Sequence, residues 1–251
     1  MSGRILVGVD GSGPSLSALR WATEFGRDDP LDLVLEHVVD ASGRPSPASV
    51  LADASAEASA AGSATTQVLA QGTPERALIA AGHTGDLLVI GTHKTGFLRG
   101  RVMGTRSVSI ATSARCSVVV VPEVYSLRAG RVVVGVAGGE RSADAVVAAA
   151  RFAADHGQEL VLIHALEDAA EATGTALLDW AEKIAATTSP GLTIRRRVSR
   201  RRVADALLDA SRVASLLVIG GERAPVEYGG GFGGVTSEVL LNLNSPVMVA
   251  R

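Results

Sequence analysis

The residues best suited to chemistry in this chain lie in one loop, GTHKTGFLRGRVMGT, which covers residues 91–105. The loop follows the apolar run 87–90, begins at Gly91 and ends with Gly104 and Thr105. Its positive charge comes from Lys94, Arg99 and Arg101. Backbone N–H groups in such a loop, placed ahead of a helix, can surround the oxygens of a phosphate group. The loop is therefore a candidate phosphate-binding site.

Short apolar runs separated by helical patterns predict the elements that hold this loop. The expected strands of the first half are Ile5–Val9, Leu31–Val39, Thr66–Gln71, Leu87–Ile90 and Ser117–Val121. A helix is expected to begin at the sequence Ser12-Gly13-Pro14, and two more to cover residues 47–62 and 74–84. This alternation predicts a parallel α/β sheet with helices on both faces. Ligands of such sheets bind beyond the carboxyl ends of the strands, where Gly8–Gly11, Val38 and Gly91 are expected.

The sequence contains an internal repeat. GRILVGVDGSGPSLSALRWA at residue 3 returns as GRVVVGVAGGERSADAVVAA at residue 130, and LLVIG at residues 87–91 returns at 216–220. One duplicated domain explains these repeats, with boundaries predicted at residues 1–125 and 128–251. The two halves are expected to superpose, and Ser117–Val121 and Pro246–Ala250 are expected near an interface between them, because an exposed edge strand must be paired or covered.

Composition narrows the class of protein. Hydrophobic residues make up 47% and charged residues 20% of the 251 residues, with a formal net charge of −2, which is typical of a soluble globular protein and gives no basic excess for nucleic acid or an anionic membrane. The apolar runs are too short to span a bilayer, and the first residues lack a signal-peptide pattern. Cys116 is the only cysteine, so no internal disulfide can form. A cytoplasmic location is expected.

Several motifs together resemble the universal stress protein family in its tandem two-domain form. They are ILVGVDGS, LEHVV, QGTPERAL, DLLVIGTHKTG, GTRSVS and CSVVVVP, and they cover nearly all of residues 3–122, with a weaker set in residues 130–251. The resemblance implies two tandem repeats of a five-stranded parallel sheet flanked by helices, of the Rossmann-like, adenine-nucleotide alpha hydrolase-like kind. Some members of this family bind ATP or AMP, with Mg²⁺ as a further expected partner, and others bind no nucleotide.

The resemblance also implies which residues meet the nucleotide. The family's signature is a glycine, two residues, a second glycine, nine residues, then glycine with serine or threonine; Gly91 and Gly104-Thr105 fit it, and Lys94 stands at the second glycine. Asp10 matches the aspartate at the adenine-ribose end. The base and its surroundings are assigned to Gly8, Val9, Val38 and Ile90, and the phosphates to His93, Arg106 and Ser107.

Lys94 alters this signature without removing its chemistry. Glycine lets a backbone N–H come close to a phosphate and permits a positive φ that costs other residues roughly 1 kcal/mol. Lysine gives up part of that approach but brings an ammonium group that pairs with phosphate. We therefore expect an altered nucleotide site in the first half.

Other interpretations stay open for several residues. His37 and His164, at equivalent strand ends, are expected to be hydrogen-bonded core histidines, and Asp10 could instead cap the turn that follows it. Cys116 is expected to pack in the core. GSGPSL lacks the third glycine of a dinucleotide fingerprint. The basic run Arg195–Arg202 is expected to be an exposed edge strand, with capture of an acidic partner as the alternative.

Three functions fit these observations. The leading hypothesis is a binding module whose first half binds ATP or AMP; the others are a scaffold without nucleotide that acts by protein–protein pairing, and a slow ATPase. Dedicated catalysis is disfavoured because Asp10 is the only acidic candidate for a catalytic role in the assembled motifs, and it is expected at the nucleoside end. The expected partners are an adenine nucleotide, the other half of the chain, a second copy and a signalling protein, but neither nucleic acid nor a membrane. The second half is expected not to bind, because Asp10 becomes Ala137 and Thr105 becomes Gly234.

Overall fold

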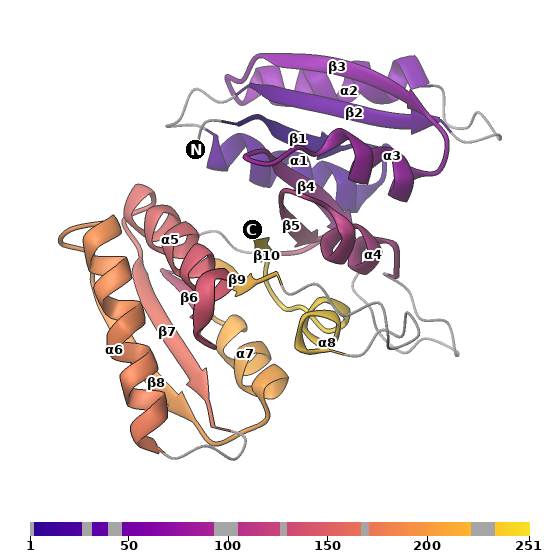
Figure 1. Cartoon of the computed structure of the whole chain (residues 1–251). Helices are drawn as coiled ribbons and strands as arrows, with labels where there is room; N and C mark the ends of the chain where they lie inside the picture. Colours follow the sequence, from indigo (N-terminus) through magenta and orange to yellow (C-terminus); the bar gives the residue numbers. More distant parts are fainter. Residues whose placement is uncertain are drawn as a thin grey trace. The chain divides into compact units, whose positions relative to one another are not determined.

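The computed structural model describes residues 3–26, 32–39, 47–92, 105–125, 130–166, 171–221 and 234–251, which fall into two compact units, Met1–Val124 and Tyr125–Arg251 (Figure 1). The first unit contains β1 (Ile5–Gly8), α1 (Gly13–Phe25), β2 (Leu33–Val39), α2 (Pro47–Ala60), β3 (Thr65–Gln71), α3 (Pro74–Ala81), β4 (Leu87–Thr92), α4 (Thr105–Ser113) and β5 (Ser117–Pro122). The second contains β6 (Arg131–Gly135), α5 (Gly139–Asp155), β7 (Glu159–Ala165), α6 (Glu171–Thr188), β8 (Ile194–Ser199), α7 (Val203–Ser211), β9 (Leu216–Gly220), α8 (Val235–Leu241) and β10 (Val247–Ala250).

The two units repeat one strand order. The first sheet runs β3-β2-β1-β4-β5, and the second runs β8-β7-β6-β9-β10, with the strands within each unit parallel. In the first unit α1 packs against α2 on one face and α3 against α4 on the other; α5 with α6 and α7 with α8 repeat this pattern (Figure 1). The predicted α/β fold class is confirmed. The pairing of the two final strands stays a prediction.

Burial explains why the inner strands are continuous apolar runs. The side chains of residues 87–90 in β4 and 118–121 in β5 are all buried, because helices cover both faces of the sheet. The edge strand β3 is different: Val68 is 38% exposed and Leu69 56% exposed. Apolar pattern thus locates the central strands well and marks the edge strands only weakly.

The basic run Arg195–Arg202 covers most of β8 and the turn after it, at the end of the second sheet's strand order. The side chains of residues 195–197 are exposed, as the edge-strand interpretation predicts. Much of its charge is paired within the second unit: Arg195 with Glu159, Arg196 with Asp179 and Glu182, Arg201 with Asp209, and Arg202 with Glu238. Ion pairs within the second unit therefore explain why several of the arginines in this run are present.

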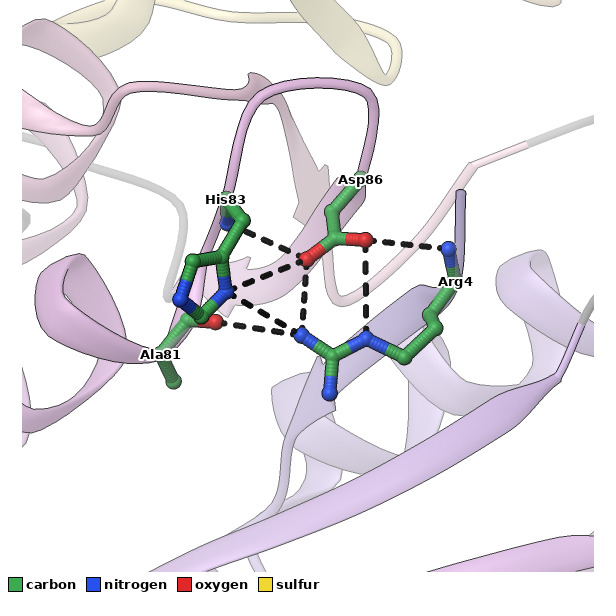
Figure 2. Close-up of polar contacts among 4 residues, drawn as sticks. All are labelled: Arg4, Ala81, His83 and Asp86. Carbon is green, nitrogen blue, oxygen red and sulfur yellow. Dashed lines mark hydrogen bonds and ion pairs between the residues drawn. The ribbon is translucent and has the colours of Figure 1, made fainter. Parts of the chain in front are cut away.

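A buried carboxylate ties the start of β1 to the turn before β4 (Figure 2). Asp86, whose side chain is 7% exposed, accepts hydrogen bonds from the backbone N–H of Arg4 at 3.0 Å and from Arg4 Nη2 at 2.8 Å. The backbone N–H of His83 donates to the same carboxylate at 3.1 Å. Burial would raise the pKa of Asp86, but these bonds from Arg4 and His83 outweigh it and hold the pKa below its ordinary value. Asp86 is thus ionised and paired.

A second carboxylate, Glu36, is buried without such partners. It lies in β2 in register with Gly8 of β1, and it is 3% exposed. Among the described residues, no group donates a hydrogen bond to its carboxylate. Burial raises the pKa of Glu36, and the positive charge of Arg4 offsets only part of this effect. The equivalent position in β7 is Ile163, which is 2% exposed, so the fold itself accepts an apolar side chain there.

We expect Glu36→Ile to raise the free energy of unfolding by about 1–3 kcal/mol at pH 7, because a buried carboxylate that accepts no hydrogen bond from the described residues is replaced by an apolar group. A carboxyl whose pKa is raised on folding binds its proton more tightly in the folded state, so its penalty appears as pH rises above the unfolded value. The gain should therefore shrink below about pH 4.5. Urea unfolding of wild type, Glu36→Ile and Glu36→Gln between pH 4 and 8 measures it. Equal stability of Glu36→Ile and wild type at pH 7 would show the prediction to be wrong.

Candidate functional site

The predicted site residues come together around one cleft at the carboxyl ends of the first sheet. Its volume is about 440 Å³, and its walls come from the ends of β1, β2 and β4 and from the first turns of α1, α3 and α4. The predicted residues that line it are Gly8, Val9, Asp10, Val38, Ile90, Gly91, Thr105, Arg106 and Ser107. The remaining predicted residues, His93, Lys94 and Gly104, lie outside the described residues.

Gly91 is required by a close approach of two backbones. A Cβ atom at Gly91 would lie 2.2 Å from the carbonyl oxygen of Pro14 and 2.7 Å from the backbone nitrogen of Ser15, at the start of α1. The second unit repeats this contact, since a Cβ atom at Gly220 would lie 2.7 Å from the carbonyl oxygen of Arg141. Packing alone therefore accounts for glycine at both positions. The same contact seats the start of α1 against the cleft.

Asp10 follows β1 and lies at the junction of two cavities. Its Oδ1 accepts a hydrogen bond from the backbone N–H of Ser12 at 3.0 Å, and its own N–H donates to Ser15 Oγ at 3.3 Å. Burial would raise the pKa of Asp10, but hydrogen bonds from Ser12 and Ser15 outweigh it and lower the pKa. Beyond the cleft, Asp10 also lines a smaller cavity of about 230 Å³ whose far wall is α2. The turn-capping interpretation is thus correct, and the ionised carboxylate also faces the cleft.

His37 and His164 each hydrogen-bond the end of their own strand to the backbone that follows the first strand of their unit. His37 is 4% exposed, and its Nδ1 lies 2.7 Å from the carbonyl oxygen of Val9. His164 makes the same bond to the carbonyl oxygen of Val136, also at 2.7 Å. Each ring nitrogen is within hydrogen-bonding distance of the chain just after the first strand of its unit. The prediction of a hydrogen-bonded core histidine is confirmed for His37, whereas His164 makes the same bond but is only half-buried.

The first turn of α4 forms the polar end of the cleft. Thr105, Arg106 and Ser107 line it, and Ser107 Oγ donates to the carbonyl oxygen of Gly91 at 3.4 Å. The first N–H groups of a helix have no partners within the helix and carry partial positive charge, which suits an anion. The Arg106 side chain is 75% exposed, and its Nε lies 3.2 Å from Oε1 of Glu75 in α3. In its described part, this end therefore offers the N–H groups of a helix start, one arginine and a carboxylate paired with that arginine.

Comparison with known proteins identifies the family. The model of the universal stress protein family matches residues 1–122. A curated universal stress protein of Mycolicibacterium smegmatis is 30% identical over 98% of this chain and 96% of its own length. The chain belongs to the universal stress protein family. A universal stress protein of Mycobacterium tuberculosis is 29% identical over 93% of this chain and 78% of its own.

A solved universal stress protein from Archaeoglobus fulgidus shares the fold over the whole chain. Its TM-score is 0.80 at 17% identity, with 100% of this chain and 99% of that chain covered. At this identity the likeness speaks for the architecture alone. The chain described here is therefore a universal stress protein of the tandem form.

The apolar wall of the cleft is the part of this universal stress protein that sequence reasoning missed. It comes from Pro14, Pro74, Leu78 and Ile110, and the polar residues missed are Ser12, Ser15 and Thr92. Leu78 is the one buried residue of α3, and its Cδ1 would lie 3.0 Å from a Cβ atom at Gly8. Glycine at position 8 thus lets the Leu78 side chain pack close to the end of β1. The two prolines in first helical turns were a usable signal, because helix starts lie at this edge of the sheet.

The second repeat of the universal stress protein has a different set of groups at the equivalent position. Ala137 replaces Asp10, although its N–H still donates to a serine, Ser142 Oγ, at 3.1 Å. In the first turn of α8, Glu238 Oε2 accepts from Arg202 Nη2 at 3.1 Å. A carboxylate therefore stands in the first turn of α8, whereas the first turn of α4 contains no acidic residue.

Within the described ranges, no three or more His, Cys, Asp or Glu side chains form a group that could hold a metal ion. No helix in the described part of the chain is long and apolar enough to cross a membrane.

Proposed function

We propose that the first domain, residues 1–125, binds an adenine nucleotide, ATP or AMP, and that the protein serves as a nucleotide-dependent binding module in a stress response. The observation that carries this proposal is the cleft itself, which gathers residues predicted from four separate segments of the sequence. A volume of about 440 Å³ is within the range of small-molecule sites.

The two ends of the cleft suit the two ends of a nucleotide. Val38, Leu78 and Ile90 offer apolar surface for a flat base. The ionised Asp10 can accept a hydrogen bond from a ribose hydroxyl or a base amino group. The start of α4, with Ser107 and Arg106, suits phosphate oxygens.

Binding without dedicated catalysis fits the described lining. Phosphoryl transfer to water needs a group that orients the water near the γ-phosphate and ligands for Mg²⁺. Among the described lining residues, Asp10 is the one carboxylate, and it lies at the end assigned to the nucleoside. The proposal therefore includes no hydrolysis step.

The proposal assigns nucleotide binding to the first domain alone. In the second, residues 128–251, Ala137 offers no carboxylate to a nucleoside. Glu238 places negative charge in the first turn of α8, where a phosphate would otherwise be attracted. We expect one nucleotide per chain.

Titration calorimetry of the full chain with ATP, AMP and adenosine tests this function. Asp10→Ala, which copies the second domain, should weaken ATP and adenosine alike by about ten-fold, since a hydrogen bond to a charged group is lost. The matched control is Ala137→Asp, which should leave affinity and stoichiometry unchanged. A stoichiometry of two nucleotides per chain would contradict the proposal that only the first domain binds nucleotide. No heat at millimolar nucleotide would favour the scaffold function.

A further inference from the structure

One ion pair at the mouth of the cleft is not explained by nucleotide binding. Arg106 lines the cleft, and Glu75 follows Pro74, which also lines it. Arg106 Nε and Glu75 Oε1 are 3.2 Å apart, and the Glu75 side chain is 27% exposed. A carboxylate thus already holds the arginine that lies at the phosphate end.

We propose that Glu75 is an internal competitor for phosphate that sets how strongly the site prefers nucleotide over nucleoside. This inference rests on the proposed function. If Arg106 turns to a phosphate, the pair with Glu75 is lost. If Arg106 stays on Glu75, the carboxylate repels the phosphate across the cleft mouth. Both routes weaken ATP binding, and neither affects adenosine, which has no phosphate.

The second unit joins its equivalent helices through an ion pair at other positions and of the opposite polarity. There the equivalent helices α7 and α8 are joined by Arg202 and Glu238, with the cation before α7 and the carboxylate on α8. Either polarity ties the two helices together. Only the polarity of the first unit places a cation at the helix start beside the cleft and keeps a carboxylate next to it. The arrangement therefore fits exchange of one anion for another.

Calorimetry of the full chain with ATP and adenosine tests the competitor. Glu75→Gln should tighten ATP by about two- to five-fold at low salt, which is the size of effect that an exposed ion pair exerts. Adenosine affinity should not change. The gain should fall as sodium chloride is added, because exposed charges are screened.

Glu57→Gln is the matched control. Glu57 pairs with Arg20 at 2.7 Å between α2 and α1, and its side chain is 40% exposed, but neither residue lines the cleft. This variant should bind both ligands as wild type does. Unchanged or weaker ATP binding by Glu75→Gln, or equal tightening of ATP and adenosine, would overturn the inference and leave the proposed function standing. A wild-type protein that binds neither ligand would remove both.

Discussion

Gly91→Ala should be among the most damaging single substitutions in this protein, and Gly220→Ala should damage the second unit in the same way. A methyl group at Gly91 would lie 2.2 Å from the carbonyl oxygen of Pro14. Because the obstacle is backbone, the start of α1 must move away from the end of β4. We expect a loss of about 3 kcal/mol or more for Gly91→Ala. The loss at Gly220 should be smaller, since its nearest atom is 2.7 Å away.

Urea unfolding of the full chain, followed by circular dichroism, measures both losses. Gly234→Ala is the matched control, because among the described residues, its chain neighbours apart, no atom lies within 4 Å of its Cβ position. Its φ of 173° is extended backbone that alanine also adopts. If Gly91→Ala unfolds at the same urea concentration as Gly234→Ala, the packing argument fails.

This prediction changes how glycine substitutions in the loop should be interpreted. Gly91 belongs to the nucleotide signature, yet Gly220 meets the same backbone contact in the unit to which no nucleotide is assigned. Loss of ATP binding by Gly91→Ala would therefore not show that Gly91 touches phosphate. Asp10→Ala is the more informative change, because the second unit already folds with Ala137 at that position.

The sequence predicted the fold well because the fold is repeated and its inner strands are buried on both faces. Two copies of each apolar run locate the same strand twice, and the errors are confined to ends: β4 continues to Thr92 beyond Ile90, and α3 ends at Ala81 before residue 84. Element ends depend on a few local hydrogen bonds, which periodicity does not resolve.

The site was predicted unevenly, for a different reason. Residues with distinctive chemistry, such as Asp10 and Ser107, were named from the motif, and the structure brings them to one cleft. Leu78 and Ile110 were not, because an apolar residue on a helix signals a core position whether or not a cleft lies beside it. The ion pair between Glu75 and Arg106 joins residues far apart in the chain, so it could not be predicted from the sequence around either residue. That the cleft binds nucleotide stays a prediction.

Asp86→Ala should lower the free energy of unfolding by about 3 kcal/mol at pH 7. The substitution removes the buried partner of Arg4 and leaves the backbone N–H groups of Arg4 and His83 without their acceptor. A backbone donor that loses its acceptor costs about 1–3 kcal/mol. The charge of Arg4 adds little to this cost, because its side chain is 42% exposed and can return to water. Figure 2 shows the bonds from Arg4 and His83 meeting at the Asp86 carboxylate.

The loss caused by Asp86→Ala, like the gain caused by Glu36→Ile, should shrink at low pH, although the two carboxyl pKa values are shifted in opposite directions. A carboxyl whose pKa is lowered on folding stabilises the protein above its unfolded value and loses that contribution as pH falls through the folded pKa. The difference between wild type and Asp86→Ala should thus be steady from pH 6 to 8 and shrink below about pH 3.8.

Glu57→Ala, which breaks the exposed pair with Arg20, is the control and should cost less than about 1 kcal/mol. The test is urea unfolding of wild type, Asp86→Ala and Glu57→Ala from pH 8 to below pH 3.8. It shows whether the loss of Asp86 costs more than the loss of an exposed ion pair. If Asp86→Ala lowers the free energy of unfolding at pH 7 no more than Glu57→Ala does, the Asp86 carboxylate does not stabilise the contact between β1 and the turn before β4. In that case the apolar packing of β1 against β4 would have to hold this end of the sheet together.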